Sequence, residues 1–175
     1  MHKGFTVWFT GLSGTGKTTC SRLLEQGLRA QGARVELLDG DEVRKRLSQG
    51  LGFSREDRNE NVTRIGYVCE LLSRHGVIAI VAAISPYREA REKVKAHIPN
   101  LVEVHMECPL EVLIKNDVKG LYKRALAGEI KNFSGISDPY EPPLNADVTI
   151  HAYRDTLEEG VARVREKLES LGLLS

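Results

Sequence analysis

An eight-residue stretch near the N-terminus has the composition and spacing of a phosphate-binding loop. It matches the pattern Gly-x-x-x-x-Gly-Lys-Ser/Thr. Glycines let the backbone curl until several N–H groups point at phosphate oxygens, and a following helix adds its positive N-terminal end. The lysine would neutralise the β- and γ-phosphates of ATP, and the hydroxyl after it would be a ligand of Mg²⁺. The loop reads Gly11-Leu12-Ser13-Gly14-Thr15-Gly16-Lys17-Thr18 and is followed by Thr19.

The surroundings of this loop favour a small-molecule kinase over other nucleotide-binding proteins. The loop lies between a predicted strand and a predicted helix, which argues against a glycine-rich turn that matches the pattern by accident. The chain has neither the Asn-Lys-x-Asp motif with which GTPases read their base nor a hydrophobic run ending in Asp-Glu, as in many ATPase motors. Its small size and a basic insert favour a kinase with a small acceptor.

Two acidic residues, Asp39 and Asp41, close the second predicted strand. In open parallel sheets, ligands bind beyond the carboxyl ends of the strands. The two carboxylates could therefore orient Mg²⁺-bound water and accept a proton from an acceptor hydroxyl. An Asp-Gly turn in which Asp41 caps a helix over 42–46 explains the same residues. The sequence leaves these two interpretations open.

A group of cationic, amide and aromatic side chains could bind an anionic acceptor. Arg58 and Asn61 are three residues apart near a helix start, so they share one face and could hold a phosphate or sulfate together. Arg44 could join them across the cleft. Phe53, in a polar loop beside a glycine, is either a satellite core residue or a stacking surface for a base. The alternative for the charged residues is a solvated helix face.

The elements that must position these residues alternate between strands and helices. Apolar, β-branched runs predict strands over 5–10, 35–38, 77–83, 101–106 and 148–150. Helical periodicity predicts long helices starting at 17, 55 and 157, and a short one lies between 40 and 54. This order predicts an α/β protein with the three-layer P-loop NTPase fold, in which helices cover both faces of a parallel sheet. Residues 116–146 interrupt the order and are predicted to form a lid insert over the site.

Length and composition narrow the remaining possibilities. The 175 residues suit a single domain, 1–175, of a soluble globular protein, with 41% hydrophobic and 28% charged residues. A net charge of +1 argues against nucleic-acid binding. Three widely spaced cysteines without a CxxC pair favour a reducing, cytoplasmic location over disulfides or a zinc site. The N-terminal apolar run of about seven residues is too short to span a membrane.

Six ordered blocks of the sequence resemble the kinases of adenosine 5′-phosphosulfate (APS). The resemblance covers nearly the whole chain, whereas shikimate, gluconate and nucleoside kinases share only the first block. The family phosphorylates the ribose 3′-hydroxyl of APS with MgATP in sulfate assimilation, so the resemblance implies this activity and a homodimer. The blocks are GLSGTGKTT (11–19), LDGD (38–41), LGFSREDRNENVTRIG (51–66), ISPYREAR (84–91), CPLE (108–111) and KGLYKRALAGEIKNFSGISDPYE (119–141).

The resemblance also implies roles for individual residues. Gly11 to Thr19 would bind the ATP phosphates, with Thr18 on Mg²⁺. Asp41, supported by Asp39, would orient or deprotonate the 3′-hydroxyl, with Lys17 and Lys119 as further catalytic groups. The acceptor would be bound by Arg44, Arg58 and Asn61 on its phosphosulfate, by Phe53 and Phe133 on opposite sides of its adenine, by Ile84 and Ser85, and by Lys119 and Leu121 closing from the lid.

Two positions need separate interpretation. Ser85 stands where bacterial members of the family are described with a phosphoserine intermediate. No histidine next to it in sequence could activate it, and direct in-line transfer needs only positioning and charge neutralisation. Its alternative role is a strand-end turn before Pro86. Asn116 replaces an arginine that the family usually has, and losing this planar cation could weaken nucleotide binding.

Two other functions are compatible with the phosphate-binding loop. The chain could be a kinase for another small acceptor, or a non-catalytic nucleotide-binding module that regulates a partner. Lys17, Thr18, Asp39 and Asp41 are all intact, which argues against a non-catalytic module.

Overall fold

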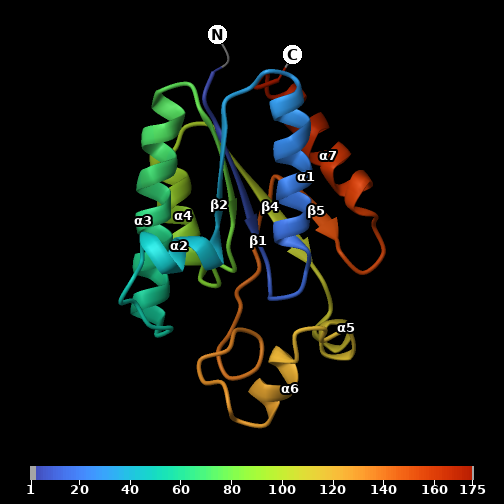
Figure 1. Ribbon diagram of the computed structural model, residues 1–175. Helices are drawn as coiled ribbons and strands as arrows, with labels where there is room; N and C mark the ends of the chain where they lie inside the picture. The colour runs from blue at the N-terminus through green and yellow to red at the C-terminus, as the bar shows by residue number, and fades with distance from the viewer. Residues whose placement is uncertain (1–2, 175) are drawn as a thin grey trace.

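A five-stranded parallel sheet forms the centre of the computed structural model, which describes residues 3–174 (Figure 1). In chain order the strands are β1 (Thr6–Thr10), β2 (Val35–Asp39), β3 (Ile78–Ala82), β4 (Leu101–Glu107) and β5 (Val148–His151). In the sheet they lie in the order β2-β3-β1-β4-β5, and every neighbouring pair is parallel. All the strands therefore have their carboxyl ends at one edge of the sheet, where ligands of such folds bind.

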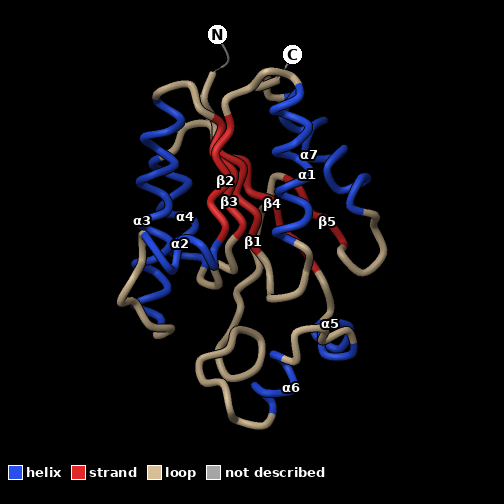
Figure 2. Tube along the Cα trace, in the orientation of Figure 1, coloured by secondary structure: helices blue, strands red, loops and turns tan. Residues whose placement is uncertain are grey.

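Helices cover both faces of this sheet, as Figure 2 shows in blue beside the red strands. The helices within residues 3–174 are α1 (Lys17–Ala30), α2 (Gly40–Arg46), α3 (Arg55–Arg74), α4 (Arg88–His97), α5 (Leu110–Lys115), α6 (Leu121–Leu126) and α7 (Leu157–Ser170). α1 packs with α7 on one face of the sheet, and α3 packs with α4 on the other. None of these helices is long and apolar enough to cross a membrane.

The position of β1 at the centre of the sheet explains why its three middle residues, Val7 to Phe9, are all apolar. Val7 and Phe9 point into the core shared with α1 and α7, and Trp8 points into the core shared with α3 and α4. A strand that is buried on both faces has a continuous apolar run instead of an alternating pattern. Trp8 is accordingly buried, with only 2% of the residue exposed.

The predicted strands and long helices are confirmed, with ends that differ by one or two residues. The sequence reasoning missed α4, because it is dominated by charged residues and buries only Ala90, Arg91 and Val94. It also missed α5 and α6, which have six residues each and are too short to show a helical period.

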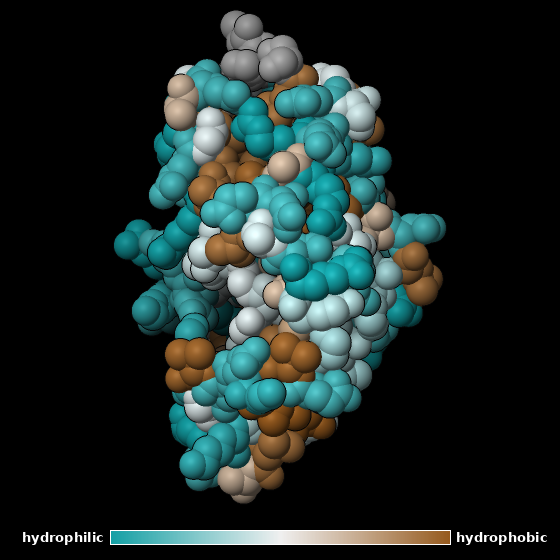
Figure 3. Space-filling model, turned by 90° about the vertical axis from the view of Figure 1, so that its right-hand side faces the viewer, coloured by the Kyte–Doolittle hydropathy of each residue, from teal (hydrophilic) through white to brown (hydrophobic). Residues whose placement is uncertain are grey.

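Between β4 and β5 the chain leaves the sheet where the lid is predicted. α5 and α6 lie beyond the carboxyl ends of the strands, below the sheet in Figure 1. The predicted range 116–146 begins directly after α5 and contains α6. Val118 and Leu126 are exposed here, and Figure 3 shows hydrophobic side chains gathered at this lower end of the molecule. The insert therefore lies at the edge of the sheet that binds ligands.

Gly66 in α3 provides a test of the packing between α3 and α4. A Cβ atom at this position would lie 2.7 Å from Cγ2 of Val94. We expect Gly66→Ala to lower the free energy of unfolding by about 1–2 kcal/mol, because overpacking outweighs the gain in helix propensity. Gly27→Ala in α1 is the matched control, because its Cβ would lie 3.6 Å from the nearest atom, the end of Arg165. The control should gain up to about 1 kcal/mol in urea unfolding. Similar values for the two variants would contradict the proposed close packing.

Candidate active site

The phosphate-binding loop connects β1 to α1, as predicted. Gly14 and Gly16 have φ angles of 83° and 87°, in the left-handed region that favours glycine. A Cβ atom at Gly11 would lie 2.6 Å from the carbonyl oxygen of Met106, so this position also requires glycine. The loop therefore has the glycines that its curled path needs, at the positive N-terminal end of α1.

Lys17 is buried beneath this loop. Its Nζ donates hydrogen bonds to the carbonyl oxygens of Gly11 at 2.9 Å and Leu12 at 2.7 Å. Burial lowers the pKa of Lys17 to about 7, and the carboxylates of Asp39 and Asp41 act in the opposite direction. Phosphate oxygens are stronger acceptors than carbonyl oxygens and would stabilise the ammonium form. The position of Lys17 therefore suits a ligand that brings negative charge.

A cleft of about 360 Å³ lies over the loop. Lys119 and Leu121 of the lid line it, and their closing over the acceptor stays a prediction. The next residue, Tyr122, fixes the lid to the loop, because its Oη donates to the carbonyl oxygen of Ser13 at 2.6 Å. The other residues that line the cleft are Ser13, Gly14, Gly16, Lys17, Thr18, Thr19, Asp39, Gly40, Asp41, Ala82 and Ile84.

The two aspartates after β2 have different structural roles. Asp39 is the N-cap of α2, since its side chain accepts the backbone N–H of Asp41 at 3.1 Å. It also accepts a hydrogen bond from Oγ1 of Thr18 at 2.8 Å. The interpretation of Asp41 as the helix cap is therefore wrong, because Asp39 is already at the position where the chain turns from strand to helix. Asp41 lies one residue inside α2, exposed, and lines the cleft.

A second pocket, of about 110 Å³, adjoins this cleft. Gly40, Asp41 and Ile84 line both cavities, so the two meet at the start of α2. Seven of the predicted acceptor residues, Asp41, Arg44, Phe53, Arg58, Asn61, Ile84 and Ser85, gather here from three separate segments of the chain. The residues found only in the second pocket are Arg44, Phe53, Arg58, Asn61, Val62, Ser85 and Pro86.

The two arginines of this pocket contact backbone carbonyl groups and an aromatic ring. Arg58 donates to the carbonyl oxygens of Phe53 at 3.1 Å and Asn132 at 2.6 Å, and Arg44 donates to that of Gly52 at 2.6 Å. Both guanidinium groups lie over the ring of Phe53, at 4.6 Å for Arg44 and 5.3 Å for Arg58. Burial and the neighbouring charge of Arg44 lower the pKa of Arg58, so an anion here would relieve an unfavourable concentration of positive charge.

Asn61 lies in the same pocket with part of its hydrogen-bonding capacity unused. The residue is 7% exposed, and within the described chain its Oδ1 atom has no hydrogen-bond partner. An unpaired buried polar atom costs about 1–3 kcal/mol and is rare in folded proteins. The Asn61 side chain is therefore open to a ligand, since its Oδ1 can accept from a ligand donor and its Nδ2 amide group can donate to an anion.

Phe133 differs from the other predicted acceptor residues, because it lines neither the cleft nor the second pocket. Its ring packs edge-on against Tyr122, with centroids 5.1 Å apart. The preceding residue, Asn132, accepts the hydrogen bond from Arg58, which also contacts the carbonyl group of Phe53. Arg58 thus connects the segments that carry the two phenylalanines. Their placement on opposite sides of one base stays a prediction.

Ser85 contributes to the wall of the pocket with its hydroxyl group turned inward. It is 3% exposed, and its Oγ accepts from Nε1 of Trp8 at 2.8 Å and donates to the carbonyl oxygen of Ala83 at 3.2 Å. Its φ angle is 45°, a left-handed conformation that is uncommon outside glycine. Such strain persists only where the surrounding structure imposes it, and it concentrates at functional sites.

A third cavity, of about 310 Å³, extends from Ser13 and Gly14 toward the segment after β5. Asn116 lines it from the lid, and Tyr153 lines it from the segment after β5. Tyr153 is 46% exposed, so its ring is available to a ligand. The sequence reasoning missed Tyr153, whose only signal is an aromatic residue directly after the carboxyl end of a strand.

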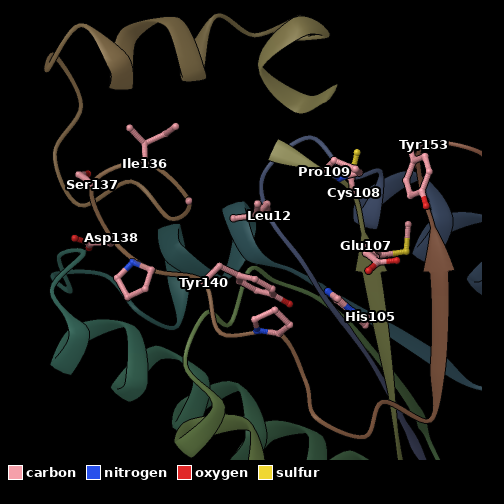
Figure 4. A pocket seen from close by; sticks show the side chains of 14 residues that line it. Leu12, His105, Glu107, Cys108, Pro109, Ile136, Ser137, Asp138, Tyr140 and Tyr153 are labelled. Carbon is pink, nitrogen blue, oxygen red and sulfur yellow. The ribbon is translucent and has the colours of Figure 1, made fainter. Parts of the chain in front are cut away.

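A larger cavity, of about 660 Å³, lies between β4, the loop and the lid (Figure 4). Leu12 is the one loop residue in its wall, and none of its lining residues is a lysine or an arginine. Tyr140 reaches into it from the lid and stacks beside His105, with ring centroids 6.0 Å apart. Without cations or loop N–H groups around it, this cavity is poorly suited to a polyphosphate.

Comparisons with known sequences agree with this geometry. Residues 3–151 match the family described as adenylylsulphate kinase. An adenylyl-sulfate kinase from Microcystis aeruginosa is 58% identical over 173 residues, covering 99% of this chain and 96% of that protein. One from Myxococcus xanthus is 57% identical, covering 98% of this chain and 94% of that protein. A probable bifunctional SAT/APS kinase from Sorangium cellulosum is 56% identical, but this chain covers only 29% of it.

Solved structures give the same result. An APS kinase from Mycobacterium tuberculosis in complex with AMPPNP and APS matches with a TM-score of 0.91 at 41% identity, over 97% of this chain and 99% of that chain. A shikimate kinase from Aquifex aeolicus matches with a TM-score of 0.54 at 19% identity, which shows a shared fold alone. The loop, the adjoining acceptor pocket and the full-length relatives lead to one conclusion: this chain belongs to the adenylylsulfate kinase family.

Proposed function

We propose that this protein transfers the γ-phosphoryl group of ATP to the 3′-hydroxyl of APS, which gives 3′-phosphoadenosine 5′-phosphosulfate and ADP. The observation that carries the proposal is the meeting of two cavities at Asp41, one over the phosphate-binding loop and one containing Arg44 and Arg58. Direct transfer requires the attacking oxygen about 3–3.5 Å from the phosphorus and in line with the leaving group. Two adjoining cavities, one for each nucleotide, would allow this arrangement.

In this proposal, ATP lies along the loop with its base in the third cavity. The loop N–H groups and Lys17 bind the phosphates. From Ser13 and Gly14, which line both cavities, the ribose and base would pass toward Tyr153. The tyrosine ring offers a stacking surface, which the side chain of Asn116 cannot provide.

The residues beside the loop also suit Mg²⁺, which takes oxygen ligands and usually keeps several waters. The Thr18 hydroxyl and the Asp39 carboxylate lie 2.8 Å apart. Residues 3–174 contain no cluster of three His, Cys, Asp or Glu that could hold an ion without the nucleotide. Thr18 would be a direct ligand, and Asp39 and Asp41 would bind the ion's waters. When bound, the ion would neutralise charge on the β- and γ-phosphates.

The acceptor would enter the second pocket with its phosphosulfate toward Arg44, Arg58 and Asn61. The phosphosulfate oxygens carry negative charge and the carbonyl oxygens do not, so the phosphosulfate would displace the carbonyl partners of both arginines. The adenine would lie against Phe53, with Phe133 moving toward its other side. The 3′-hydroxyl would then lie beside Asp41, where the cavities meet.

The chemistry needs a proton acceptor and positive charge but no covalent intermediate. Asp41 would orient the hydroxyl and take its proton, while Lys17 and Lys119 would stabilise charge on the transferring group. Ser85 would stay unmodified, because its hydroxyl is bound to Trp8 and to the carbonyl oxygen of Ala83, and neither is a base that could activate it.

The direct test measures ADP release with purified protein, ATP and Mg²⁺. Turnover should appear with APS and be absent with shikimate, gluconate or adenosine as acceptor. Turnover with one of the other acceptors would replace the proposed substrate, and ATP binding without turnover on any acceptor would indicate a regulatory module.

Asp41→Asn tests the proton acceptor. We expect kcat to fall by about 10²–10⁴, the usual contribution of general base catalysis, because an amide cannot take up the proton. Binding of a non-hydrolysable ATP analogue should change little. Glu42→Gln is the matched control, because Glu42 is an exposed neighbour in the same helix turn. An Asp41→Asn variant with normal kcat would remove Asp41 from the mechanism.

Thr18→Val tests the metal site without relying on turnover. In the wild type, Mg²⁺ should tighten the binding of AMPPNP relative to EDTA. Thr18→Val should lose most of this gain because it lacks the hydroxyl ligand, and Thr18→Ser should keep it. Calorimetric titrations with and without Mg²⁺ measure the difference. A gain of wild-type size in the valine variant would show that Thr18 is not a ligand.

Asn61→Leu separates acceptor binding from stability. The substitution removes a buried, unpaired oxygen, so the melting temperature should stay constant or rise. The KM for APS should rise about tenfold, because the substitution also removes the Nδ2 amide group, and losing its one hydrogen bond to an anion costs roughly 1.5 kcal/mol. Asn59→Ala is the control, since Asn59 bonds Glu89 on another face of α3 and does not line the pocket. If KM changes equally in the two variants, Asn61 has no specific role.

The homodimer and the cytoplasmic location implied by the sequence also remain proposals. Analytical ultracentrifugation of the purified chain would settle the first, with twice the monomer mass as the expected result.

A further inference from the structure

Arg91 is a buried cation that the proposed mechanism does not use. It lies in the second turn of α4 and is 4% exposed. Its Nε lies 3.4 Å from Oε2 of Glu103 on β4, and its guanidinium carbon lies 5.7 Å from the centre of the Tyr140 ring. Burial raises the pKa of Glu103, and the charge of Arg91 opposes this change. The ion pair with Glu103 explains how the buried charge of Arg91 is tolerated. It involves only Nε, so it does not account for the two Nη atoms.

The remaining guanidinium nitrogens contact two backbone segments that are far apart in the chain. Nη1 donates to the carbonyl oxygen of Ser85, and Nη2 donates to that of Glu141. The first segment is the strained wall of the acceptor pocket. The second is the stem of the lid, where the insert returns toward β5. One planar group therefore joins the pocket wall to the lid stem.

Neighbouring contacts bind the same two segments. The backbone N–H of Glu141 donates to the carbonyl oxygen of Pro86 at 2.8 Å. Oγ1 of Thr10, at the end of β1, donates to the carbonyl oxygen of Ile84 at 2.7 Å and lies 3.0 Å from Oη of Tyr140. Figure 4 shows the Tyr140 side chain extending from the stem toward β4. Arg91 contacts the same junction through the carbonyl groups of Ser85 and Glu141, and its guanidinium group is the charged donor among these contacts.

We propose that Arg91 is a positioning residue for the acceptor: its guanidinium fork fixes the left-handed turn at Ser85 and the lid stem at Glu141 in one geometry, so that the wall formed by Ile84, Ser85 and Pro86 is in place before the acceptor binds. This inference rests on the proposed function, because the acceptor used to measure it is APS. Two carbonyl groups and a carboxylate around one side chain match the planar donors of arginine and do not match the single ammonium of lysine.

A purely stabilising role for Arg91 makes a different prediction. Buried ion pairs are weak contributors to stability, and replacing both partners with neutral side chains is often harmless to the fold. If Arg91 only balanced Glu103, a neutral pair would work as well as the charged one. If Arg91 positions the wall, a neutral pair would fold and still bind the acceptor poorly.

The test uses two variants and a control in the whole protein. Arg91→Lys keeps the charge and removes the fork. Arg91→Met/Glu103→Gln removes both charges and leaves no buried carboxylate unpaired. Lys95→Met is the matched control, because Lys95 is a cation of the same helix that bonds Asp147 at 2.8 Å. For each protein we would measure the KM for APS, the Kd for AMPPNP and the melting temperature.

We expect the KM for APS to rise at least about tenfold in both Arg91 variants, equivalent to about 1.4 kcal/mol of lost acceptor binding. The Kd for AMPPNP should stay within about twofold of wild type in both, as should the KM for APS in the Lys95 control. An unchanged KM in Arg91→Lys would show that charge alone suffices and would overturn the inference. Equal losses for APS and AMPPNP would also overturn it, because they indicate general disruption.

The two proposals fail in different ways. If the wild type does not phosphorylate APS, the proposed function is wrong, and the inference about an APS-binding wall falls with it. If the wild type is active and the Arg91 variants retain its KM for APS, only the role of Arg91 is wrong.

Discussion

The site depends on one kind of interaction: hydrogen bonds from cationic side chains to backbone carbonyl oxygens. Lys17 donates to the carbonyls of residues 11 and 12, Arg58 to those of 53 and 132, and Arg91 to those of 85 and 141. Carbonyl groups position a cation but neutralise it only in part, so a phosphate or sulfate oxygen remains the better acceptor for a cation it can reach. Positive charge is thus concentrated at the carboxyl edge of the sheet in a chain whose net charge is only +1.

The strand order explains how this charge would serve the two nucleotides of the proposed reaction. β1 lies between β3 and β4, so the loop that follows it is central at the ligand-binding edge. The segments after β2 and β3 supply Asp41 and Ile84 on one side of the loop, and the segments after β4 and β5 supply Cys108 and Tyr153 on the other. A donor nucleotide can therefore extend away from the acceptor, while its terminal phosphate points toward Asp41.

The sequence predicts what depends on short-range spacing and fails where three-dimensional neighbours decide. The loop from Gly11 to Thr18 was predictable because its glycine positions are set locally. The choice between Asp39 and Asp41 as helix cap was not, because a shift of one residue in the start of α2 exchanges their roles. The helix carrying Arg91 was hidden by its charged residues, and the contact of Arg91 with residue 141 spans 50 positions. Tyr153 was not predictable either, because only the three-dimensional packing places it beside the insert in the wall of the third cavity.

The lid contacts both halves of the site, and the strength of each contact determines which part of the lid can move. At one end Tyr122 bonds the carbonyl group of Ser13 in the donor loop, and in the middle Asn132 accepts from Arg58 in the acceptor pocket. At its stem, Glu141 is bonded by Arg91 and by the carbonyl group of Pro86. An acceptor anion would compete with Asn132 for Arg58 but would leave the buried bonds of the stem intact. Acceptor binding should therefore release the middle of the lid while its stem stays fixed, so the segment carrying Phe133 can move onto the base without disturbing the pocket wall.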